Sequence, residues 1–188
     1  YGILSIDFRN HGDSDGDITS MGVYEIRDAR AAYEFLHEQD DIQQIVLMGH
    51  SLGGAVASQL MQEVDADGLI IDSTFADFAS IVRAGVIARG FPPTPITEIL
   101  VSMAGIMSQA DWNSVRPIDF LASVDKPILW LHGSHDLTIP IENAYRLAEV
   151  NPQIKLVEFE DGAHSNLFEV DSELYQTEVL AYLGNMFD

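Results

Sequence analysis

The 188-residue chain carries 30 acidic and 9 basic side chains, a net charge of −21, which disfavours nucleic acid and anionic membrane surfaces as partners because phosphate binding requires clustered Lys and Arg. A hydrophobic fraction of 47% is typical of a globular domain, and the lack of cysteine excludes disulfide and thiolate chemistry. No apolar run approaches the roughly 20 residues that a membrane-spanning helix needs, so no membrane contact is evident in the sequence.

Apolar periodicity predicts strands and helices that alternate along the chain. Short apolar runs bounded by Gly, Asp or Asn predict strands, and apolar residues spaced by three and four predict helices. In chain order we expect a strand at 1–8, helix 23–37, strand 45–48, helix 55–63, strand 68–72, helices 75–89, 96–107 and 116–124, strand 127–132, helix 141–150, strand 154–159 and helix 170–186. This order predicts an α/β fold, a mostly parallel sheet of about five strands with helices on both faces.

The hexapeptide at 49–54 (GHSLGG) is the strongest chemical motif. Gly-x-Ser-x-Gly between a strand and a helix is the context of a nucleophile elbow, a strained turn that exposes the serine above the sheet edge. We expect Gly49 and Gly53 to leave room where the chain reverses, with Gly54 leaving more. The helix N-terminus behind Ser51 offers N–H groups to a developing oxyanion. The alternative is an ordinary Gly-Ser loop.

Two later loops carry the groups that a serine nucleophile needs. A serine hydroxyl requires a base, and the base requires an orienting acid. In a parallel sheet such groups lie on loops at the carboxyl ends of strands. Residues 133–136 (GSHD) and 161–165 (DGAHS) follow two such strands. Ser51, Asp136 and His164 therefore follow one another in the order of the α/β-hydrolase fold. Asp72 is a rival acid, and a structural loop histidine is the alternative for His164.

The remaining histidines are not predicted to be catalytic, and no metal or cofactor is expected. His132 ends a strand and should be buried and hydrogen-bonded, whereas His50 should pack beside the elbow. The aspartates at 13–17 lack the Gly and Glu positions of an EF-hand loop. No group of His and Asp residues has the spacing of a zinc site.

On these motifs the sequence resembles the α/β-hydrolase superfamily, and within it the Bem46-like serine hydrolases and related acyl esterases. The matching segments span nearly the whole chain: IDFRNHGDSDG, IVLMGHSLGG, GLIIDSTF, PILWLHGSHDLTIP and DGAHSNLF. The resemblance implies that Ser51 is the nucleophile, Asp136 the acid and His164 the base. It also implies that the backbone N–H of Leu52 is one oxyanion donor.

The resemblance also sets expectations for the rest of the domain. Residues 1–188 would form one domain, with a small helical cap inserted at about 80–117. In that cap, four side chains would line the acyl pocket, or would equally be plain core: Phe91, Met103, Met107 and Trp112.

The beginning of the chain departs from the family pattern. The family's second oxyanion donor follows an earlier strand, which would precede Tyr1, so we expect an N-terminally truncated domain. Its sheet would then have a gap, or would pair residues 1–8 directly with 45–48. A signal or an anchor would also lie upstream, so the localisation is open and cytoplasmic only by default.

We therefore expect a serine hydrolase that needs no cofactor and cleaves a small, uncharged ester or other acyl substrate. The same three residues would also serve an amidase or peptidase, a thioesterase or a C–C hydrolase. A non-enzymatic binding protein or an inactive truncated fragment is the remaining alternative. The serine at the elbow argues against dehalogenases and epoxide hydrolases, which use aspartate there. The sequence does not set the oligomeric state.

Overall fold

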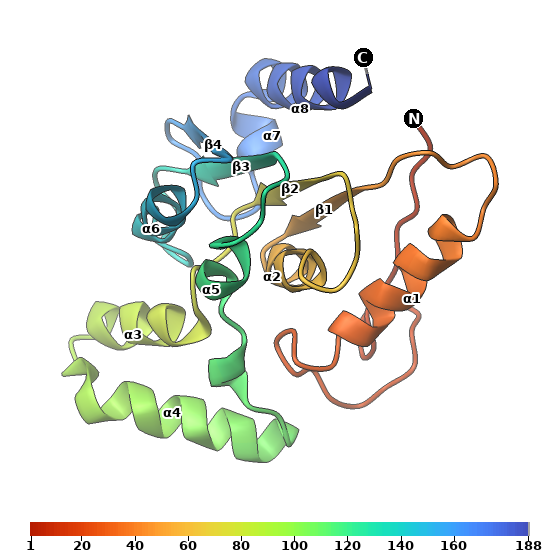
Figure 1. Cartoon of the computed structure of the whole chain (residues 1–188). Coiled ribbons are helices and arrows are strands. Elements are labelled where there is room, and N and C mark those ends of the chain that lie inside the picture. Colours follow the sequence, from red (N-terminus) through yellow and green to blue (C-terminus); the bar gives the residue numbers. More distant parts are fainter. Residues whose placement is uncertain (188) are drawn as a thin grey trace.

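The centre of the structure is a parallel sheet of four strands. The computed structural model describes residues 1–187, and in it the strands lie in the order in which they occur along the chain (Figure 1). All three pairings between neighbours are parallel. The strands are β1 (Val46–His50), β2 (Gly68–Asp72), β3 (Ile128–Gly133) and β4 (Ile154–Phe159). The predicted α/β fold with a parallel sheet is confirmed, with one strand fewer than expected.

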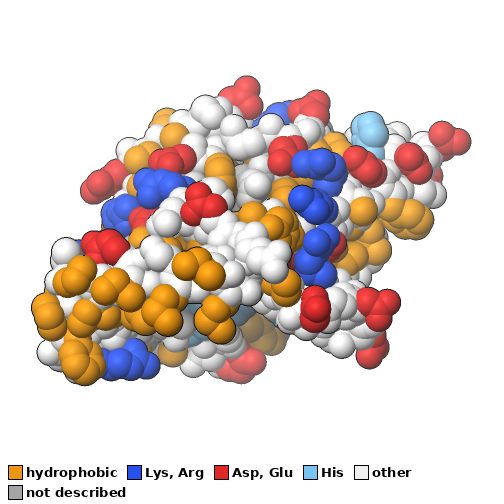
Figure 2. All heavy atoms as spheres, turned by 90° about the horizontal axis from the view of Figure 1, so that it is seen from below, with side chains coloured by type: hydrophobic (Ala, Val, Ile, Leu, Met, Phe, Trp, Pro, Cys, Tyr) orange, Lys and Arg blue, Asp and Glu red, His pale blue; other side chains and the backbone are white. Residues whose placement is uncertain are grey.

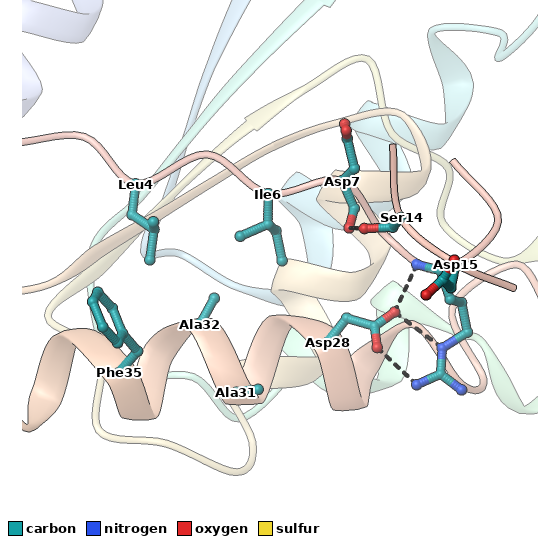
Figure 3. A pocket seen from close by; sticks show the side chains of 10 residues that line it. Leu4, Ile6, Asp7, Ser14, Asp15, Asp28, Ala31, Ala32 and Phe35 are labelled. Carbon is teal, nitrogen blue, oxygen red and sulfur yellow. Dashed lines mark hydrogen bonds and ion pairs between the residues drawn. The ribbon is translucent and has the colours of Figure 1, made fainter. Parts of the chain in front are cut away.

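The missing strand is residues 1–8, for which the prediction was wrong. This segment belongs to no sheet and lies beside α1 (Ile26–His37), so it does not pair with β1 (Figure 1). Leu4 and Ile6 point toward α1, on which Ala32 and Phe35 face them (Figure 3). An apolar run becomes a strand only where another strand's backbone accepts its hydrogen bonds, and this run contacts a helix instead.

Helices cover both faces of the sheet. On one face lie α2 (Leu52–Leu60), α5 (Pro117–Leu121) and α6 (Glu142–Val150), with α1 beyond α2 (Figure 1). On the other face lies α8 (Ser172–Phe187), preceded by the short α7 (Leu167–Val170). Right-handed crossovers that advance in one direction place their helices on one face. The opposite face is therefore covered by the helix that follows the last strand.

Side chains along the central strands alternate between two cores. Leu69 and Ile71 of β2 pack with α2, α5 and α6, whereas Ile70 between them packs with α8. On β3, Trp130 belongs to the first core and Leu129 to the second. Since both faces are buried, these strands consist of nearly continuous apolar residues.

The segment between β2 and α5 forms a helical layer. It contains α3 (Phe78–Ala88), α4 (Pro93–Ser108) and the single 3-10 turn η1 (Trp112–Ser114). α3 is capped by Asp77, whose side chain accepts a hydrogen bond from the backbone N–H of Ser80 at 2.8 Å. A separate core joins this layer to the rest of the molecule: Ala55, Phe75, Phe78, Val101, Val115 and Ile139.

α4 turns its large apolar side chains away from that core. Its buried residues are Thr97, Val101 and Ser108. The apolar side chains of Figure 2 gather on the side of the molecule where α3 and α4 lie. The exposed large side chains of α4 are Ile99, Leu100, Met103, Ile106 and Met107.

Candidate active site

Ser51 lies on a strained turn between β1 and α2. Its φ of 51° and ψ of −116° are a combination that residues other than glycine rarely adopt. Two hydrogen bonds from the segment that ends β2 hold the turn. The Ser51 N–H donates to the carbonyl oxygen of Asp72 at 2.9 Å, and the Thr74 hydroxyl donates to the carbonyl oxygen of Ser51 at 2.8 Å. Pairing of β1 with β2 thus supports the conformation of this serine.

Gly49 and Gly54 are the glycines that make room for the turn. A Cβ on Gly49 would lie 2.3 Å from the backbone carbon of Gly53, and one on Gly54 would lie 1.9 Å from Thr74 Oγ1. A Cβ on Gly53 would meet nothing within 4 Å. The expectation that Gly53 leaves room by lacking a side chain was therefore wrong, because its backbone is what approaches Gly49.

Ser51, His164 and Asp136 form one continuous chain of hydrogen bonds. His164 Nε2 lies 3.1 Å from Ser51 Oγ, and His164 Nδ1 lies 2.8 Å from Asp136 Oδ2. The three residues follow β1, β4 and β3, respectively. Because a carboxylate only accepts hydrogen bonds, Nδ1 carries the ring proton and Nε2 is left to accept the serine hydroxyl.

The environment of Asp136 keeps its carboxyl group ionised. The residue is only 3% exposed, and burial by itself would raise its pKa. Hydrogen bonds from His164 and from the backbone N–H groups of Ile139 and Thr138 outweigh burial and hold the pKa of Asp136 below its ordinary value. A buried carboxylate thus accepts the hydrogen bond of His164 Nδ1.

Leu52 is the first residue of α2, directly after Ser51. The first N–H groups of a helix have no acceptor within the helix. The backbone N–H of Leu52 is therefore available to an oxygen of a bound molecule, and the positive end of the helix dipole favours a negative charge there.

The rival acid, Asp72, is bonded elsewhere. The Tyr175 hydroxyl on α8 donates to Asp72 Oδ2 at 3.0 Å. Burial, the charge of Asp72 and this hydrogen bond all raise the pKa of Tyr175, so its hydroxyl remains a donor. Asp136, rather than Asp72, is the carboxylate that contacts His164.

Four neighbours of the site add contacts that the motifs alone do not specify. His50 Nε2 lies 3.0 Å from the hydroxyl of Ser165, and the His50 and His164 ring centroids are 5.1 Å apart. His132 is fully buried, as predicted, and bonded to Trp130. Only its place beside His164 in the sequence could have singled out Ser165, and nothing local singled out Trp130.

The four predicted pocket residues lie in the α3–α4 layer. Phe91, Met103 and Met107 are exposed, whereas Trp112 is half-buried and packs edge-on against Phe78 with ring centroids 4.6 Å apart. A cavity of about 520 Å³ is lined instead by the N-terminal segment and α1 (Figure 3). A pocket built by these four residues stays a prediction.

Among residues 1–187, no cluster of three or more His, Cys, Asp or Glu side chains is arranged to hold a metal ion. Over the same range, no helix has both the length and the apolar character to cross a membrane.

Known proteins resemble this chain in sequence and in fold. The alpha/beta hydrolase domain-containing protein WAV2 of Arabidopsis thaliana is 30% identical over 194 residues, which cover 96% of this chain and 60% of WAV2. An esterase of Pyrococcus furiosus matches with a TM-score of 0.73 at 23% identity, covering 97% of this chain and 69% of the esterase. Est1E of Butyrivibrio proteoclasticus, solved with ferulic acid, matches with a TM-score of 0.73 at 21% identity, covering 96% and 75%.

The family assignment rests on most of the chain. The sequence profile of the alpha/beta hydrolase family matches residues 1–177, a range that includes the elbow and both later loops. The two solved structures share the fold at lower sequence identity. The chain belongs to the alpha/beta hydrolase family.

Proposed function

We propose that this chain carries the catalytic residues of a serine hydrolase that cleaves carboxylic esters through an acyl-enzyme. The supporting observation is the unbroken contact from Asp136 through His164 to Ser51, with distances of 2.8 and 3.1 Å. Membership of the alpha/beta hydrolase family supports hydrolysis as the reaction class. The esterases among the fold neighbours favour esters.

Acylation begins at Ser51. As its Oγ attacks the ester carbonyl carbon, His164 Nε2 takes the hydroxyl proton and Asp136 stabilises the resulting imidazolium. The carbonyl oxygen becomes an oxyanion that the Leu52 N–H stabilises. Collapse of the tetrahedral intermediate breaks the bond to the alkoxy oxygen, and His164 returns the proton to the leaving alcohol.

Deacylation repeats these steps with water. His164 removes a proton from a water molecule as that water attacks the acyl carbon of the ester to Ser51. Collapse of the second intermediate releases the carboxylic acid and restores the serine hydroxyl. All proton transfers use the same ring, so the reaction needs no cofactor.

The charge of the molecule favours a neutral substrate. With a net charge of −21, the protein repels anionic molecules at long range. We therefore expect small, uncharged esters to be turned over faster than esters that carry a carboxylate or a phosphate.

A fluorophosphonate probe, which labels activated serines, tests the proposal on the full-length protein. We expect the wild type and Ser102→Ala, which changes an exposed serine on α4, to be labelled, and Ser51→Ala not to be. Failure of the wild type to label, or labelling of Ser51→Ala, would refute the proposal. Hydrolysis of matched ester, thioester and aminoacyl-amide substrates then decides which of these three bonds is cleaved.

A further inference from the structure

We propose that His132 is a positioning residue for this reaction. Its neutral imidazole is hydrogen-bonded to the loop after β3, and this bond keeps Asp136 in contact with His164. The inference rests on the proposed function and adds a residue to it. His132 lies near the end of β3, four residues before Asp136, and is fully buried.

Its two partners determine where the His132 proton lies. The indole N–H of Trp130 donates to His132 Nδ1 at 3.2 Å, and His132 Nε2 lies 2.9 Å from the carbonyl oxygen of Ile139. An indole N–H only donates and a carbonyl only accepts. Nδ1 is therefore the acceptor and Nε2 the donor, which defines a neutral ring. A second proton, on Nδ1, would point at the indole N–H.

Ile139 connects this ring to the catalytic acid. The carbonyl group of Ile139 is held by His132, while its N–H donates to Asp136 Oδ1 at 2.7 Å. The N–H of Thr138 donates to the same carboxylate oxygen at 2.8 Å. Asp136 Oδ1 is thus fixed by the turn that contains Thr138 and Ile139, and His132 is hydrogen-bonded to that turn. The other carboxylate oxygen, Oδ2, is directed at His164.

Because His132 is neutral, it does not compete with His164 for the negative charge of Asp136. His132 Nε2 lies 3.8 Å from Asp136 Oδ2, the oxygen that accepts from His164. A positive charge on His132 would compete for that oxygen. Burial lowers the pKa of His132 against the opposing influence of the Ile139 carbonyl and of Asp136 and Asp72, and nearby His164 lowers it further.

Two substitutions separate this role from simple packing. His132→Gln keeps an N–H for Ile139 and an oxygen for Trp130, whereas His132→Leu keeps neither. We expect His132→Leu to lower kcat on a p-nitrophenyl ester by on the order of tenfold to a hundredfold with little change in KM, since a displaced acid supports the imidazolium less well. The acid limb of its pH profile should move to lower pH. In His132→Gln, kcat and the position of the acid limb should both stay close to those of the wild type.

An NMR spectrum of the histidine ring protons tests the inference without an activity measurement. In the wild type and His132→Gln, the Nδ1 proton of His164 should give a downfield NMR resonance from its bond to Asp136, and His132→Leu should lose it. The ring nitrogens of wild-type His132 should report a neutral Nε2–H form at neutral pH. A doubly protonated His132 at neutral pH, or retention of the resonance, kcat and acid limb in His132→Leu, overturns the inference. If the wild type reacts with the fluorophosphonate probe and hydrolyses the ester, such a result overturns the role of His132 and leaves the proposed function intact.

Trp130→Phe provides a second variant should His132→Leu not fold. It removes the donor that faces Nδ1 while keeping an aromatic ring in the core. We expect His132 to take up a proton at mildly acidic pH in this variant, with activity lost there and recovered at higher pH. A pH profile unchanged from that of the wild type would count against the proposal.

Discussion

At the scale of single residues, the site depends on backbone geometry as much as on functional groups. Ser51 occupies its strained conformation because Asp72 and Thr74, both from the end of β2, bond its N–H and its carbonyl oxygen. The acid likewise owes its position to two backbone N–H groups. Substitutions that alter these supports should therefore lower the proposed esterase activity without removing the side chain of Ser51, His164 or Asp136.

Gly54→Ala should disrupt the elbow, whereas Gly53→Ala should not. The new methyl at position 54 would lie 1.9 Å from Thr74 Oγ1, the group that bonds the Ser51 carbonyl, while position 53 has no atom within 4 Å. We expect Gly54→Ala to lower the free energy of unfolding by about 1–3 kcal/mol and to reduce the proposed esterase activity. Denaturant unfolding and initial rates measure both. Equal behaviour of the two variants would contradict this account of the turn.

Asp136→Asn should abolish most activity, and Asp72→Asn should not. The first change removes the charge that stabilises the His164 imidazolium and allows the wrong ring tautomer, at a cost of roughly 10⁴-fold in kcat. The second affects a carboxylate that is bonded to Tyr175. Steady-state kinetics of both variants provide the comparison. A larger loss in Asp72→Asn would make Asp72 the working acid.

At the scale of elements, the start of α1 depends on a buried carboxylate. The predicted helix began at residue 23, but α1 begins at Ile26, after a turn around Glu25. This carboxylate accepts hydrogen bonds from the Ser20 N–H at 2.6 Å, the Ser20 hydroxyl at 2.5 Å and the Gly22 N–H at 2.8 Å. Burial would raise the pKa of Glu25, but these bonds outweigh burial and lower it.

Glu25→Gln should destabilise the protein by about 1–3 kcal/mol at neutral pH. A lowered pKa in the folded state means that the ionised group contributes stability above the unfolded-state pKa, and that the contribution is lost as the pH falls through the folded-state pKa. The difference from the wild type should therefore shrink in acid. Denaturant unfolding at a series of pH values measures it, and a constant difference would refute the explanation.

The sequence predicted best those elements whose surroundings are apolar on every side. The strand at 68–72 coincides with β2, because burial of both faces leaves an unmistakable apolar run. Ser51, His164 and Asp136 were expected to meet because order along the chain becomes position along a parallel sheet, and they are in contact, while their catalytic role stays a prediction. The strand prediction for residues 1–8 was wrong because a strand forms only where a second strand, distant in the sequence, pairs with it. The prediction for Gly53 was wrong because the sequence does not show which backbone atoms come close to one another at the turn.

At the scale of the whole molecule, one segment gathers several exposed apolar side chains. Seven of the exposed large hydrophobic side chains lie in the short stretch 87–107, which carries a single acid, Glu98: Ile87, Phe91, Ile99, Leu100, Met103, Ile106 and Met107. Elsewhere the acidic surface opposes self-association. The outer face of α4 is thus where contact between molecules at high concentration is expected to begin.

Met107→Glu should increase solubility without lowering the melting temperature. Its side chain is 80% exposed, so the charge disrupts no packing. Val101→Glu, on the buried face of the same helix at 3% exposure, should lower the melting temperature strongly. Light scattering against concentration and thermal unfolding test the pair. A destabilised Met107→Glu would mean that the outer face of α4 is packed in the folded protein.

The sequential order of the strands has a consequence for the order in which the site is assembled. The supports of the Ser51 turn come from residues up to Thr74, so the turn is complete once β2 pairs with β1. His164 arrives only with the loop after β4. During refolding we expect the Ser51 amide to become protected from hydrogen exchange before Ser51 reacts with the fluorophosphonate probe. Pulsed hydrogen exchange and probe labelling, measured over the same time course, would show this order. A partly folded or still growing chain would then hold a shaped but unactivated serine.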